Sequence, residues 1–150
     1  MKIFAVGNPF YGDDGVGAAV LEEIRRCEVF PGAELIDVHT DALALLDHLA
    51  LGEKNVVVDA AQMGLEPGAA VGFRPDEVGM KIKSDHLSMH GFGLAEAFDL
   101  AGRLDKMPAD VLIVGVEPAR IEINQGLSDV VKEAVPHVIS IIQAEVQSDG

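Results

Sequence analysis

Residues 3–17 read IFAVGNPFYGDDGVG, and this stretch decides the fold class. Residues 3–6 are a short apolar run that ends at a glycine and an asparagine, which is typical of a strand that enters a turn. The apolar residues then recur every four positions, at Val16, Val20 and Ile24. This spacing, with charged residues on the other face, predicts an amphipathic helix. The stretch therefore predicts a strand, a glycine-rich turn and a helix in succession.

The same alternation of strands and helices continues along the chain. Apolar patterns predict further strands at residues 35–38, 56–58, 69–73 and 111–114, a small extra strand at 120–123, and helices at 42–49, 94–101 and 127–146. Pro136 should kink or split the last helix, and residues 76–90 fit no regular pattern. We therefore expect an α/β protein, a three-layer α/β/α sandwich with a mostly parallel twisted sheet of about five strands, and residues 1–150 as one domain.

The composition limits the classes of function. The chain of 150 residues has 11 Lys and Arg against 25 Asp and Glu, a net charge of −14. Such a surface repels phosphate backbones, so we expect no nucleic-acid partner. No apolar run approaches the ~20 residues that cross a bilayer, so we expect no membrane insertion. The lone cysteine, Cys27, allows no internal disulfide, and the chain starts on a strand rather than a signal peptide, so we expect a cytoplasmic location.

Polar residues follow the predicted strands directly. In a parallel α/β sheet the functional crevice lies at the carboxyl ends of the strands. The residues at these ends are Asn8, Asp13, Asp14, His39, Asp41, Asp59 and Glu117. We therefore expect five carboxylates along a single edge of the sheet.

The turn at residues 7–17 has alternative interpretations. A dinucleotide-binding loop requires G-x-G-x-x-G, whereas the glycines here are residues 7, 12, 15 and 17, and paired aspartates at the helix start would repel a pyrophosphate. Either Asp13 or Asp14 can be the N-cap of the helix, a role worth ~1 kcal/mol. One aspartate is enough for that role. The other is therefore available as a metal ligand or as a base.

Asp59 and His90 are the other candidate site residues. Asp59 is either a turn residue or a carboxylate that points into the crevice, and His90 is either an inert loop histidine or a ligand, with His86 and His39 as competitors. Two carboxylates and one imidazole make chemical sense as an incomplete metal site. The imidazole moves the preference from magnesium or calcium toward nickel, zinc or iron, and open positions remain for water or for donors of a substrate.

Four motifs occur in an order that resembles the hydrogenase maturation endopeptidases. They are GNPFYGDDGVG at residues 7–17, VVDA at 57–60, HGFGL at 90–94 and GVEP at 115–118. The resemblance covers nearly the whole chain. It implies that Asp14, Asp59 and His90 bind the metal, with Asp14 and Asp59 as the catalytic carboxylates.

The resemblance also implies a reaction. Members of this family remove a C-terminal peptide from the precursor of the large subunit of a [NiFe] hydrogenase after nickel insertion. The resemblance implies that the nickel is carried by the substrate rather than resident. The absence of thiolates from the crevice fits this, because the precursor's cysteines would supply them. Either the three residues complete the coordination of this nickel, which then acts as template and Lewis acid, or an aspartate acts as a general base. We expect a monomer.

Some features leave room for other functions. The family resemblance leads us to expect a small, glycine-rich turn after the second strand, where this chain has His39 and Asp41, which could join the site or be inert. Residues 76–86 match no family motif. A non-proteolytic accessory or binding subunit of a hydrogenase complex is the alternative function. A metallohydrolase with a resident ion is a third, and it predicts tight metal binding by the isolated chain.

Overall fold

The computed structural model describes residues 1–85 and 93–148. Its strands are β1 (Lys2–Ala5), β2 (Glu34–Asp37), β3 (Asn55–Gln62), β4 (Ala70–Phe73), β5 (Ser84–Asp85) and β6 (Val111–Val116). Its α-helices are α1 (Val16–Cys27), α2 (Leu45–His48), α3 (Val78–Lys81), α4 (Leu94–Arg103) and α5 (Asp129–Ser148). Short 3₁₀ helices, η1 (Gly12–Gly15), η2 (Ala42–Ala44) and η3 (Pro75–Glu77), precede α1, α2 and α3.

The sheet is mostly parallel, as predicted. Its main path has the order β2-β1-β3-β6-β4, in which the first four strands are parallel and β4 is antiparallel to β6. The short β5 pairs antiparallel with the end of β3, beyond the part that contacts β1. The valines of β3 are fully buried because the strand is central and both of its faces are covered. The predicted α/β class is confirmed.

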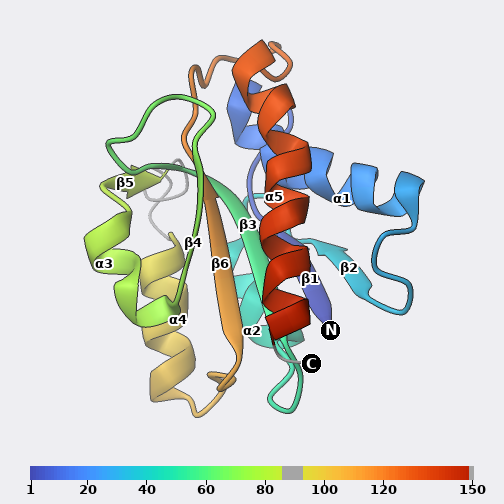
Figure 1. The fold of residues 1–150 in the computed structure, drawn as a ribbon. Helices are drawn as coiled ribbons and strands as arrows, with labels where there is room; N and C mark the ends of the chain where they lie inside the picture. Colours follow the sequence, from blue (N-terminus) through green and yellow to red (C-terminus); the bar gives the residue numbers. More distant parts are fainter. Residues whose placement is uncertain (86–92, 149–150) are drawn as a thin grey trace.

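Helices cover both faces of the sheet (Figure 1). One core lies between the sheet and the pair α1 and α5, and includes Val56 and Val58. The other lies on the side of α2 and α4, and includes Val57 and Ala61. Because successive side chains of a strand point to opposite faces, Asp59 shares the face of Val57 and Ala61.

Three local predictions are corrected. The strand that starts at Asn55 runs to Gln62, because β6 pairs with it as far as Ala60 and β5 pairs with its last two residues. Residues 120–123 are not a strand, since only an isolated bridge joins Ile123 to Tyr11. The last helix is continuous through Pro136. The buried face of α5 packs on the sheet on both sides of the proline, which offsets the missing backbone hydrogen bond.

No helix in the described ranges 1–85 and 93–148 has the length and apolar character needed to cross a membrane. The longest, α5, has 20 residues and carries charged side chains on its exposed face.

Candidate active site

The strand order reverses between β1 and β3. From β1 the chain passes through α1 to β2 on one side, and it returns through α2 to β3 on the other side. Open α/β sheets bind ligands at such a switch point, at the carboxyl ends of the strands. Asp14 in η1 and Asp59 in β3 flank this point from its two sides. The structure thus places two of the three predicted site residues at the expected edge.

Asp14 is buried and held by the turn that precedes it. Its side chain does not cap a helix; instead its Oδ2 accepts a hydrogen bond of 2.7 Å from the backbone N–H of Asn8. The turn has space for this arrangement only because Gly7 lacks a side chain. Gly7 has a φ of +132°, and a Cβ atom there would lie 2.2 Å from the carbonyl oxygen of Asp14. A glycine at position 7 therefore leaves the space that the Asp14 backbone occupies.

Asp59 is only 1% exposed and lies inside β3, not at its end as predicted. Its neighbour on the β6 side is Gly115, the residue opposite it in the register. On the other side, β1 follows β3 only as far as the hydrogen bond from Val6 N–H to the Val58 carbonyl, and Gly7 N–H then donates to His39 instead. The segment that follows β1 therefore separates from β3 directly beside Asp59. This separation is how a carboxylate within a strand comes to lie at the switch point.

Asp13 is buried beside Asp14 but has different partners. Among the described residues, its carboxylate accepts hydrogen bonds from the connection between β6 and α5, more than 100 residues further along the chain. Burial by itself would raise the pKa of Asp13, but its hydrogen bonds with Arg120, Ser128 and Ala119 outweigh burial and lower the pKa below its usual value. Neither aspartate caps a helix, so the N-cap alternative does not apply to this pair.

Glu117 is also used by the fold. Its Oε1 accepts hydrogen bonds from the backbone N–H groups of Met63, at 2.8 Å, and Leu65, at 3.0 Å. These bonds fix the turn that follows β3, at the same edge of the sheet as the end of β6. Of the five carboxylates expected at this edge, Asp13 and Glu117 thus stabilise loops, a role that sequence reasoning missed because their partners are distant in the chain.

The remaining candidate residues are either exposed or outside the described part of the chain. The side chain of His39 is 72% exposed and its Nδ1 lies 3.6 Å from Asp37, while Asp41 is exposed on the same loop. His86 and His90 lie outside the described residues. Within residues 1–85 and 93–148, no group of three His, Cys, Asp or Glu side chains could hold a metal ion.

Residues 18–145 match the family model HycI, described as hydrogenase maturation protease. The chain belongs to this family. A curated relative, the hydrogenase expression/formation protein HupM of Azotobacter chroococcum, is 32% identical over 121 residues, which are 80% of this chain. The chain spans 58% of that relative's length.

Solved structures of maturation proteases have the same fold. The hydrogenase maturating endopeptidase HybD of Escherichia coli superposes with a TM-score of 0.82, at 24% identity, over 100% of this chain and 94% of that one. The [NiFe] hydrogenase maturation protease HybD of Thermococcus kodakarensis gives a TM-score of 0.76, at 26% identity, over 95% of this chain and 96% of that one. The sandwich described above is thus the fold of these maturation proteases.

Proposed function

We propose that this chain is an endopeptidase that removes the C-terminal peptide from the large-subunit precursor of a [NiFe] hydrogenase after nickel insertion, acting as a monomer in the cytoplasm. One observation carries the proposal: two buried carboxylates, Asp14 and Asp59, flank the switch point of the sheet in a chain of this family. Burying a carboxylate costs free energy that its partners have to offset. Here they lie where this fold class binds its ligands.

The nickel belongs to the substrate in this proposal. Asp14, Asp59 and His90 would face it and add two oxygen donors and one nitrogen donor, while the precursor keeps its own ligands. The Asn8 N–H holds the Asp14 carboxylate in one orientation, so that Oδ2 does not have to be ordered when the substrate arrives. The donor types fit a borderline divalent ion, which is the class to which nickel belongs.

Two roles of the carboxylates in the cleavage step are distinguishable. As ligands, Asp14 and Asp59 hold the nickel-bearing part of the precursor so that its scissile bond lies beside a polarised water. As a general base, one of them accepts the proton of the attacking water, and the nickel serves for recognition alone. Variants whose carboxylates differ in basicity test the second role, because a pH profile of cleavage that does not shift between them would count against a general base.

The deciding experiment incubates the purified chain with nickel-loaded precursor and with nickel-free precursor. We expect cleavage of the loaded precursor alone. Asp14→Asn and Asp59→Asn keep the side-chain shape and an oxygen acceptor but remove the charge, and each should lower the cleavage rate by roughly 10³-fold. Asp41→Asn is the matched control, since Asp41 is an exposed carboxylate at the same edge.

Two outcomes would contradict the proposal. Cleavage of neither precursor, with a large subunit from the same organism as substrate, favours the non-proteolytic accessory subunit. A stoichiometric metal ion that survives dialysis of the isolated chain favours a metallohydrolase with a resident ion.

A further inference from the structure

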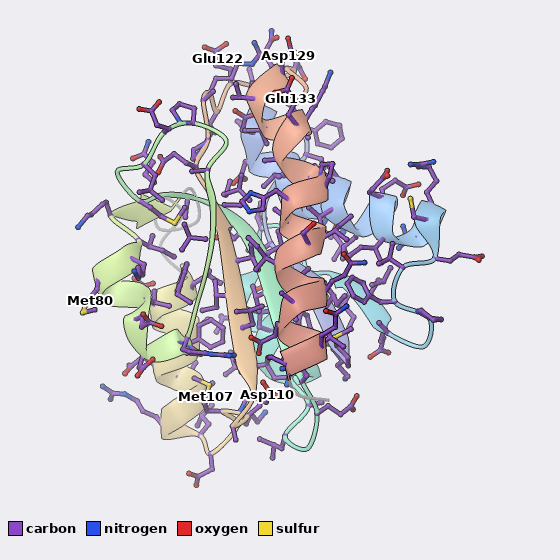
Figure 2. The ribbon with its side chains drawn as sticks, viewed as in Figure 1. Met80, Met107, Asp110, Glu122, Asp129 and Glu133 are labelled. Atoms are coloured by element: carbon purple, nitrogen blue, oxygen red, sulfur yellow. The ribbon has the colours of Figure 1, made fainter. Side chains whose placement is uncertain are left out.

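The connection from β6 to α5 folds back over the turn that bears Asp14. Figure 2 shows two residues of this region, Glu122 and Asp129, at the same end of the molecule, where α5 begins. Three backbone hydrogen bonds join the connection to residues 10–13: Asn124 N–H to Phe10, Gly12 N–H to Gln125, and Asp13 N–H to Arg120, at 2.7 to 2.9 Å. The two segments therefore form one packed unit, although more than 100 residues separate them.

The Asp13 carboxylate lies at the centre of this unit and is fully buried. Its Oδ2 accepts hydrogen bonds from the N–H groups of Ala119, at 2.8 Å, and Arg120, at 3.0 Å, and from the Ser128 hydroxyl, at 2.8 Å. Its Oδ1 accepts the Ser128 N–H at 2.6 Å. A carboxylate offers about four acceptor sites, and these four bonds engage both of its oxygens. The Asp13 carboxylate is thus held by the connection between β6 and α5.

Asp13 is nevertheless rigidly connected to Asp14. The two are consecutive in η1, a single turn of four residues that are all buried. Asp14 N–H donates to the Tyr11 carbonyl at 3.1 Å, and Gly7 leaves no space between its own Cα and the Asp14 backbone. A shift of Asp13 would therefore move Asp14 with it. A helix cap could be exchanged for another without this effect, but neither aspartate caps α1.

We propose that Asp13 is a positioning residue for the cleavage reaction. By tying residues 119–128 to η1, its carboxylate fixes the Asp14 carboxylate at the place where the precursor is cleaved. This inference rests on the function proposed above and deepens it. It assigns the two acids of the motif different tasks: Asp13 holds the turn and Asp14 meets the substrate.

The test compares the full chain with Asp13→Asn in steady-state cleavage of nickel-loaded precursor. The amide keeps one acceptor oxygen but turns an NH₂ group toward N–H donors, so the connection should loosen. We expect kcat to fall between about 10-fold and about 100-fold, because displacements near 1 Å have such effects, while KM stays within about threefold. Hydrogen exchange of the Ala119, Arg120 and Ser128 amides should become at least about tenfold faster.

Two further variants separate positioning from loss of stability. Ile142→Ala removes a buried core side chain of α5 outside this connection, and it should lower Tm at least as much as Asp13→Asn but leave kcat unchanged. Ser128→Ala removes one of the four hydrogen bonds, should lower kcat roughly threefold, and decides the question should Asp13→Asn not fold.

Each outcome has a defined meaning. If the wild-type chain cleaves loaded precursor and Asp13→Asn keeps kcat within twofold, or if Ile142→Ala loses as much kcat at an equal loss of Tm, the positioning role is overturned and the proposed function stands. If only KM rises, Asp13 acts on substrate binding and the positioning role is again overturned. If the wild-type chain cleaves no precursor, the proposed function fails and this inference falls with it.

Discussion

Gly7→Ala tests whether the geometry of the Asp14 turn matters for function. Gly7 has a φ of +132°, which L residues rarely adopt, and the added methyl carbon would lie 2.2 Å from the Asp14 carbonyl oxygen. Ordinary contact of this kind begins near 3.4 Å, so the Asp14 backbone has to move by about 1 Å. The strained backbone and the overpacking each cost about 1–3 kcal/mol, and together they should lower the free energy of unfolding by about 3 kcal/mol or more.

We expect Gly7→Ala to impair cleavage more than it impairs folding. A domain with a typical free energy of unfolding of about 5–15 kcal/mol survives this loss, but a carboxylate displaced by about 1 Å lowers the rate by about 100-fold. Urea denaturation measures the loss in the free energy of unfolding, and an assay with nickel-loaded precursor measures the loss in the cleavage rate. Gly52→Ala is the matched control, because Gly52 is exposed and nothing lies within 4 Å of its added methyl carbon. A Gly7→Ala chain that cleaves within threefold of the wild-type rate would refute the reasoning.

Three further predictions concern charged side chains. Glu145 accepts hydrogen bonds from Lys54 at 2.8 Å and from Arg74; burial would raise its pKa, but these bonds outweigh burial and lower the pKa below the ordinary value of 4.5. Glu145→Gln should lower the free energy of unfolding by about 1–2 kcal/mol at pH 7, and the difference should disappear as the pH falls through the lowered pKa, which urea denaturation at several pH values measures. Glu117→Ala leaves the buried N–H of Met63 and the half-buried N–H of Leu65 without their acceptor and should cost about 2–3 kcal/mol in the same assay. His39→Gln should keep the cleavage rate within about threefold, since that side chain is 72% exposed; a larger loss would place His39 in the site.

The sequence predicts most elements of the fold because each has a local pattern. Continuous valines indicate the central strand β3, and a spacing of four indicates α1. The end of β3 has no such signal, since residues 60–62 are two alanines and a glutamine. Those residues become a strand because β6 supplies a partner for Ala60, and β5 supplies partners for Ala61 and Gln62. Pairing partners distant in the chain are the kind of information that a local pattern lacks.

The same reason explains what the sequence predicts of the site. Asp14 and Asp59 are found at the carboxyl edge because the alternation of strands and helices predicts that edge, and the family motifs mark the same two residues. The task of Asp13 cannot be predicted in this way, because its four donors belong to residues 119–128. The local alternative, an N-cap at one of the two aspartates, is not what the structure shows.

The different roles proposed for Asp13 and Asp14 follow from how a protein can keep a buried carboxylate charged. A ring of N–H and O–H donors does so by satisfying the oxygens, and it thereby consumes the sites that a metal or a water would need. Asp13 is of this kind, and its lowered pKa is the consequence. A carboxylate that is to meet a substrate must keep part of its acceptor capacity and be oriented by something else. The Asn8 N–H and the neighbouring η1 turn orient Asp14, and the turn is itself fixed by Asp13. Under the proposed function the two adjacent acids divide the work: Asp13 holds the loop, and Asp14 faces the precursor.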